Sequence, residues 1–125
     1  MALALAVNHV SLTVTDLDRS LAFWSGLLGL EPLPRPQLGV DGAWLGIGAS
    51  AVHLIVLSDG RTDVGTTPGT INPAAPHVAL TVADYDTTVA QLRAAGLELV
   101  ETNAARGQCW VQDPDGYVIE FITAR

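Results

Sequence analysis

The sequence predicts an α+β fold built from two similar βαβββ modules. Three observations lead to this prediction: an internal repeat, the spacing of apolar residues within each copy, and turn residues between the copies' elements. Residues 9–22 and 77–90 align at an offset of 68, with eight of fourteen positions identical. The match resumes downstream, where Trp44 corresponds to Trp110 and residues 52–56 correspond to residues 119–123. Two copies are too few for a solenoid, so we expect a pseudo-twofold pair of modules.

The first half is typical of a strand, a helix and three further strands. Residues 7–14 alternate between apolar and small or polar side chains, the period of a half-buried strand. Asp16 or Asp18 supplies a helix N-cap, an apolar stripe at helical spacing follows, and Gly29 stands where a helix normally ends. Strand-like runs then follow at residues 30–33, 43–47 and 52–57.

The second half repeats this order. After the strand that begins near His77, Asp84 or Asp86 is the expected N-cap and Gly96 the expected helix end. Strand-like runs follow at residues 97–102, 108–112 and 117–123, and the turn sequence 113–116 (Asp-Pro-Asp-Gly) joins the last two as a hairpin. We expect one domain over residues 1–125, with module one at about 5–58, a linker at about 59–75 and module two at about 76–125.

Composition excludes several classes of partner. The chain has 13 acidic and 6 basic residues, and every basic residue is an arginine, which argues against nucleic acid and anionic membranes. No run approaches the roughly 18 apolar residues of a membrane span. The apolar segment Met1–Val7 lacks the positively charged region of a signal peptide, so we expect it to lead into the first strand. The single cysteine, Cys109, cannot form an internal disulfide and is compatible with the cytoplasm.

The candidate site consists of all three histidines and one glutamate. His9 and His77 open the repeated strands, and His53 and Glu120 follow them by 44 and 43 residues at equivalent positions near the end of each copy. A lone histidine on a strand is more often a hydrogen-bonded side chain than a metal ligand, but chance placement would scatter the three. Three imidazoles and a carboxylate suit a divalent ion such as Zn²⁺, Ni²⁺, Fe²⁺, Mn²⁺ or Co²⁺ and leave octahedral positions for substrate.

Other polar and aromatic residues have plainer interpretations. We favour packing over a pocket-lining role for Trp44 and Trp110, and packing over nucleophilic chemistry for Cys109. The linker, rich in glycine, threonine and proline, is a connection or a lid, and Arg61 within it is a solvated residue or an anion contact. Arg106 carries the same two alternatives.

At these residues the chain resembles the vicinal oxygen chelate superfamily, which includes glyoxalase I, extradiol dioxygenases, fosfomycin resistance enzymes and bleomycin resistance proteins. The resemblance rests on residues 8–14, on Phe23-Trp24 in the first helix, on residues 76–80 and on residues 113–121. It implies paired modules that form a U-shaped, partly open eight-stranded barrel around a divalent metal, commonly in a homodimer. Carried over by position, the implied ligands are His9, His53, His77 and Glu120.

The resemblance also implies a reaction type. Members bind a small oxygen-rich substrate through neighbouring oxygens, and the metal acts as a Lewis acid. We therefore expect a glyoxalase-like lyase or isomerase in which Glu120 also transfers a proton. His53 departs from glyoxalase I, which usually has a carboxylate there. The alternatives are an extradiol dioxygenase using Fe²⁺ with His9, His77 and Glu120, and a metal-free protein that binds a drug or another small molecule. A fosfomycin-modifying role would need a cationic pocket made from Arg35, Arg61 or Arg106.

Overall fold

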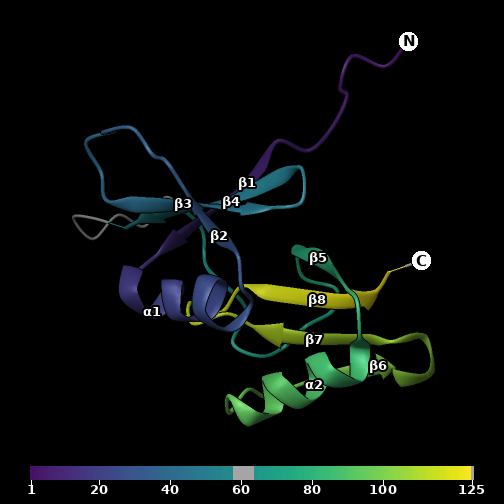
Figure 1. The fold of residues 1–125 in the computed structure, drawn as a ribbon. Helices are drawn as coiled ribbons and strands as arrows, with labels where there is room; N and C mark the ends of the chain where they lie inside the picture. Colours follow the sequence, from purple (N-terminus) through teal and green to yellow (C-terminus); the bar gives the residue numbers. More distant parts are fainter. Residues whose placement is uncertain (58–63, 125) are drawn as a thin grey trace. The chain divides into compact units, whose positions relative to one another are not determined.

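The computed structural model describes residues 1–57 and 64–124 (Figure 1). The chain divides into two compact units, Met1–Gly65 and Thr66–Arg125, and each unit contains one βαβββ module. The predicted α+β class and the two modules are therefore confirmed. The first part of the predicted linker, including Arg61, lies outside the described residues. Within the described residues, no helix is long and apolar enough to cross a bilayer.

Module one has a four-stranded sheet with the order β1-β4-β3-β2. The strands β1 and β4 are parallel, whereas β3 is antiparallel to both β4 and β2. The last strand begins two residues earlier than the sequence predicts, because the hairpin from β3 is tight. The bounds are β1 His9–Val14, β2 Glu31–Leu33, β3 Gly42–Ile47 and β4 Ser50–Val56.

The helix of module one begins as predicted but changes its winding. Asp16 caps it by accepting a hydrogen bond from the Arg19 amide, and the α-helix α1 (Leu17–Leu21) continues as a π-helix, η1 (Ala22–Leu27). The Leu28 amide donates to the Phe23 carbonyl five residues back, at 3.0 Å. This segment buries two consecutive aromatic side chains, Phe23 and Trp24.

Module two repeats the same sheet with the order β5-β8-β7-β6. The α2 helix begins after Asp84 and is followed by Gly96, whose φ of 84° ends it in the left-handed region. The next strand begins three residues later than predicted, because the Leu97 amide still bonds to the Leu92 carbonyl of the helix. The bounds are β5 His77–Val82, α2 Tyr85–Ala94, β6 Val100–Asn103, the 3₁₀ turn η2 Ala104–Arg106, β7 Gln108–Gln112 and β8 Val118–Thr123.

In each module the helix covers one face of its own sheet (Figure 1). That face is apolar: in module one Val52 and Leu54 of β4 are buried, and in module two Ile119 and Phe121 of β8 are buried. Because side chains alternate along a strand, the residues between them lie on the opposite face. The sequence pattern therefore places the candidate ligands on the face of the sheet that the helix does not cover.

Candidate metal centre

His53 and Glu120 occupy equivalent places in the two sheets. On the parallel ladders, His53 of β4 pairs with Ser11 of β1, and Glu120 of β8 pairs with Ala79 of β5. Each therefore lies across from the residue two places after the histidine that opens its module. This register agrees with the alignment of the two copies in the sequence.

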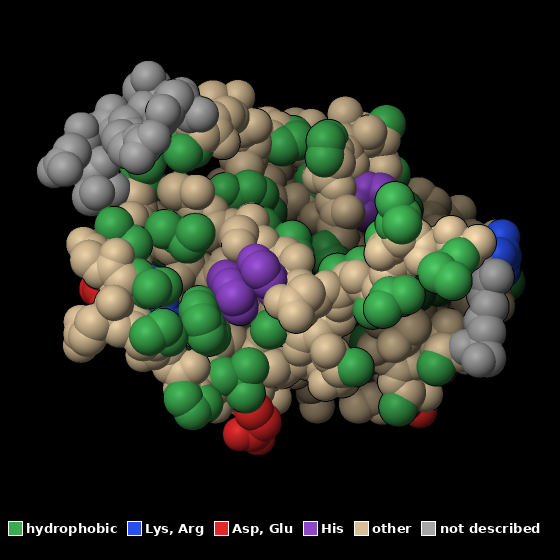
Figure 2. Space-filling model, turned by 90° about the horizontal axis from the view of Figure 1, so that it is seen from above, with side chains coloured by type: hydrophobic (Ala, Val, Ile, Leu, Met, Phe, Trp, Pro, Cys, Tyr) green, Lys and Arg blue, Asp and Glu red, His purple; other side chains and the backbone are tan. Residues whose placement is uncertain are grey.

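The module-one pair consists of stacked aromatic rings. The His9 and His53 rings lie 3.9 Å apart between centroids with an interplanar angle of 12°, and Trp44 stacks on His53 at 4.5 Å and 9°. The Trp44 side chain comes from β3 and His9 from β1, so the two flank the central strand β4. Figure 2 shows two histidine side chains in contact at the surface. The stacking fixes the plane of the His53 ring.

The environment of His53 favours its neutral imidazole form. Burial, followed by the charges of His9 and Arg35, lowers the pKa of His53 from its usual 6.5. A neutral imidazole keeps the lone pair that a metal needs. His53 is therefore available as a ligand at a lower pH than an ordinary histidine.

The module-two pair consists of a histidine and a carboxylate in direct contact. His77 Nε2 lies 3.2 Å from Glu120 Oε1, and the Trp110 ring meets His77 edge-on at 4.6 Å. Glu120 is only 7% exposed, an unusual degree of burial for a carboxylate. Its other oxygen, Oε2, accepts a hydrogen bond of 2.9 Å from Gln108 Nε2.

A chain of hydrogen bonds orients that carboxylate. Trp110 Nε1 donates to Thr102 Oγ1 at 3.0 Å, Thr102 Oγ1 donates to Gln108 Oε1 at 3.0 Å, and the Gln108 amide then donates to Glu120. The Gln108 side-chain oxygen accepts from Thr102 and its nitrogen donates to Glu120, so only one orientation of this amide forms both hydrogen bonds. Glu120 therefore faces His77 with a fixed Oε1 atom.

The donor chemistry of the module-two pair fits a cation. His77 Nδ1 lies 2.7 Å from the Ala75 carbonyl, which only accepts, so Nδ1 carries the hydrogen. In a neutral ring Nε2 then has a lone pair, which faces a carboxylate oxygen. Two acceptors at that distance require a second proton or a cation between them. The Nδ1 atom of His9 also lies close to an acceptor, Asn8 Oδ1, at 2.7 Å. A hydrogen bond from the other ring nitrogen is usual for metal-ligating histidines.

The structure brings the four predicted residues together as two pairs, His9 with His53 and His77 with Glu120. Among the described residues, no group of three or more potential ligands is present. A site made from both pairs therefore stays a prediction. The sequence interpretation missed Asn8, Gln108 and the Ala75 carbonyl, although Gln108 shares a face with Trp110 by strand alternation and was detectable in principle.

Cys109 has no part in either pair. Its side chain is wholly buried, and burial is the main cause that raises the pKa of its thiol. A thiol with a raised pKa is a poor nucleophile. This agrees with the packing role expected from the sequence.

A protein-family model described as the glyoxalase/bleomycin resistance protein/dioxygenase superfamily matches residues 6–121. The chain belongs to this superfamily. It is 33% identical to a lactoylglutathione lyase of Haemophilus influenzae, with 93% of this chain and 90% of that protein aligned. It is 29% identical to a protein of Arabidopsis thaliana named glyoxylase I 4, over 93% of this chain and 69% of that one.

Solved structures of the superfamily share the fold. A glyoxalase family protein of Bacillus anthracis matches with a TM-score of 0.79 at 22% identity, covering 100% of this chain and 99% of that one. The trypanothione-dependent glyoxalase I of Leishmania major matches with a TM-score of 0.75 at 25% identity, covering 96% of this chain and 87% of that one. The fosfomycin resistance protein FosX of Mesorhizobium loti matches with a TM-score of 0.71 at 18% identity, covering 100% and 94%. One fold thus serves several reactions, and the residues of the site must separate them.

Proposed function

We propose that the chain is a divalent-metal-dependent lyase or isomerase of the glyoxalase type, acting on a small substrate with two neighbouring oxygen atoms. The observation that carries this proposal is the 3.2 Å contact between His77 Nε2 and the buried Glu120 carboxylate, with His9 and His53 paired at the equivalent positions of module one. The relatives named lactoylglutathione lyase, which align over most of this chain, support the same reaction type.

His9, His53, His77 and Glu120 would hold the metal, one pair from each module. The bound metal would supply Lewis acidity, which polarises a substrate carbonyl and stabilises the negative charge that develops on its oxygen. Three imidazoles and one carboxylate give a set that accepts zinc, nickel, iron, manganese or cobalt, and the chain's residues do not select among them.

Glu120 is the proposed proton-transfer group. Oε1 faces His77, whereas Oε2 accepts a hydrogen bond from Gln108 and retains a second lone pair. We assign to Oε2 the removal of a proton from the substrate carbon next to the carbonyl and its return to the neighbouring carbon. Gln108 positions that oxygen, and the burial of Glu120 excludes competing water.

The module-one pair has a binding role in this proposal. Neither His9 nor His53 has a carboxylate partner among the described residues, so module one supplies no second carboxylate base at the equivalent place. A single base moves the proton away from and back to the same face of the substrate. The homodimer and the cytoplasmic location expected from the sequence remain predictions.

The test combines metal content with activity. Protein purified without chelators is expected to hold about one divalent metal per chain by elemental analysis, and His77→Ala and Glu120→Ala are expected to lose most of it. Glu98→Gln removes an exposed carboxylate of the same module and serves as the matched control. The metal-loaded protein is then assayed with the hemithioacetal of methylglyoxal and glutathione, and with other hemithioacetals.

Two outcomes would overturn the proposal. Oxygen consumption with ring cleavage of a catechol would replace the lyase by an extradiol dioxygenase. Stoichiometric binding of a drug by protein that stays metal-free under metal supplementation would replace the enzyme by a binding protein.

A further inference from the structure

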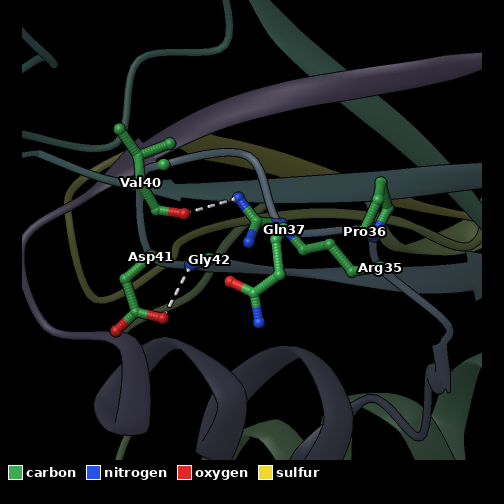
Figure 3. A pocket seen from close by; sticks show the side chains of 7 residues that line it. Arg35, Pro36, Gln37, Val40, Asp41 and Gly42 are labelled. Carbon is green, nitrogen blue, oxygen red and sulfur yellow. Dashed lines mark hydrogen bonds between the residues drawn. The ribbon is translucent and has the colours of Figure 1, made fainter.

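Module one has a second feature, a cavity of about 500 Å³ beside the loop between β2 and β3 (Figure 3). Residues of the segment 35–42 line it. From residue 31 to residue 41 every side chain is exposed except that of Arg35, which is half-buried. The loop thus shields one arginine.

The Arg35 guanidinium is held in place before any ligand arrives. Its Nη2 donates to the Val40 carbonyl at 3.0 Å, and Pro34 and Pro36 restrict the backbone on both sides. A Cβ on Gly42 would clash with the Leu54 carbonyl oxygen and would lie 3.0 Å from Nη2 and 3.2 Å from Cζ, so the guanidinium packs closely against this glycine. A preorganised guanidinium loses less entropy when it binds a ligand.

This guanidinium has no acidic partner among the described residues. Its Nε is buried without a hydrogen-bond acceptor, and no described carboxylate forms an ion pair with it. Asp41 lines the same cavity, but its carboxylate accepts from the Gly42 amide at 3.0 Å and points away from the guanidinium in Figure 3. In a chain with 13 acidic residues, an arginine held without a carboxylate calls for an explanation.

The equivalent position in module two supplies that explanation. On the β3–β4 ladder, Gly42 pairs with Ile55, two residues from the pair Trp44–His53. On the β7–β8 ladder, Gln108 pairs with Ile122, two residues from the pair Trp110–Glu120. Gly42 and Gln108 are therefore equivalent positions. The Arg35 guanidinium therefore lies beside Gly42, the residue of module one that corresponds to Gln108. Gln108 donates to a carboxylate, whereas the residue at the matching position in module one is His53, which accepts no such bond.

We propose that Arg35 and its loop form an oxyanion-binding subsite, which takes a carboxylate or phosphate group of the substrate. Gly42 and Trp44 lie on the same face of β3, so the anion would lie beside His53, about 7 Å away along the ladder at the usual rise per residue. A guanidinium offers paired donors suited to either group. That the anion belongs to the substrate rests on the proposed function; that the subsite binds an anion does not.

The test uses metal-depleted protein, so that it is independent of activity. Amide resonances are followed by ¹⁵N NMR during titration with inorganic phosphate and, separately, with acetate, while sodium chloride keeps the ionic strength constant. Saturable shifts are expected in residues 35–42 with at least one anion. Arg35→Gln is expected to weaken binding about tenfold or more, as for loss of a hydrogen bond to a charged group. The stronger of the two probes identifies the chemistry of the anion.

Two further variants sharpen the result. Arg106→Gln removes an exposed arginine of module two and is expected to leave the binding unchanged. His53→Glu introduces a carboxylate near Arg35. It is expected to abolish anion binding, because this carboxylate forms an ion pair with the guanidinium in place of the added anion. Shifts that are absent, that follow ionic strength alone, or that persist in Arg35→Gln would overturn the subsite. Anion binding in a protein without turnover would instead refute only the proposed function.

Discussion

The two modules have the same strand order and pairing, but the side chains at their candidate sites differ in chemistry. Trp44 faces His53 across one pair of strands, and Trp110 faces Glu120 across the equivalent pair. In module one the ring of His53 is stacked between aromatic neighbours, and in module two Glu120 contacts His77 and accepts a hydrogen bond from Gln108. The same register thus produces a stacked pair in one module and a pair of polar groups in contact in the other.

The difference between the modules follows from the replacement of a carboxylate, Glu120, by an imidazole, His53, and from the residues around each. A carboxylate needs donors, so module two has Gln108 and its partners around Glu120. In module one His53 stacks on Trp44, Gly42 stands at the place of Gln108, and the Arg35 guanidinium packs against Gly42. Under the proposed function, the two modules keep the same strand pairing while module two transfers the proton and module one binds.

The largest expected effect distinguishes the proposed proton-transfer role of Glu120 from the proposed binding role of His53. Glu120→Gln keeps the shape of the side chain but removes the base, and turnover is expected to fall by about 100-fold to 10,000-fold at saturating metal. His53→Gln is expected to weaken metal affinity by about tenfold or more, with turnover recovering when metal is added in excess. Metal titration and steady-state kinetics on both variants measure this. Equal loss of turnover in both at saturating metal would contradict the division of roles.

A smaller effect is expected from the hydrogen-bond chain that orients Glu120. Gln108→Leu removes the donor to Oε2 and is expected to reduce metal affinity or activity by about 10-fold to 100-fold. The loss is expected because the Glu120 carboxylate is then no longer held in one orientation. Gln91→Leu, on the exposed side of α2, is the matched control. Unchanged metal affinity and activity in Gln108→Leu would reduce Gln108 to a packing residue.

The module-one pair has its own pH signature in metal-free protein. Burial first, then the charges of His9 and Arg35, lowers the pKa of His53 below its usual 6.5. Between that lowered value and 6.5 the unfolded state binds more protons, so the free energy of unfolding is expected to decrease as pH falls through this window. Urea titrations of the wild type and His53→Gln test this. The variant should show a flatter dependence, and an identical slope would contradict the assignment.

The sequence predicted the fold well where one residue pattern determines one element. The alternation in residues 7–14, the N-cap Asp84 and the glycines after both helices led to the observed elements. The π-helix at Ala22–Leu27 was not predicted, because the spacing of apolar residues does not distinguish its winding from that of an α-helix. The start of β6 was wrong by three residues, because the Leu97 amide caps the end of α2 by bonding to the Leu92 carbonyl, and the strand begins only after this cap.

The sequence also predicted the candidate ligands and their pairing, but not what holds them. His9 with His53 and His77 with Glu120 follow from the repeat, because a conserved ladder brings equivalent positions together. The Ala75 carbonyl depends on the conformation of a loop, which no periodic pattern encodes. The correspondence of Gly42 with Gln108 was readable from the alignment of Trp44 with Trp110, but the filling of that space by Arg35 was not.

The smallest expected effects lie where the modules are most alike, at the caps of their helices. Asp16 accepts from the Arg19 amide at 3.0 Å and Asp84 from the Thr87 amide at 2.8 Å, so Asp16→Ala and Asp84→Ala are expected to lower the unfolding midpoint by similar amounts.

Asp84 adds a pH dependence to this capping role. The Thr87 backbone hydrogen bond lowers its pKa below the usual 3.8, so its contribution to stability is complete above that value and is lost as pH falls through the lowered pKa. Asp84→Asn keeps the capping oxygen but does not ionise, so it should retain most of the midpoint at neutral pH and show a flatter acid dependence. Acid titrations of the unfolding midpoint, followed by circular dichroism, compare Asp84→Asn with Asp84→Ala. If the asparagine variant is as acid-sensitive as the wild type, the charge of Asp84 does not stabilise the helix and its cap acts through geometry alone.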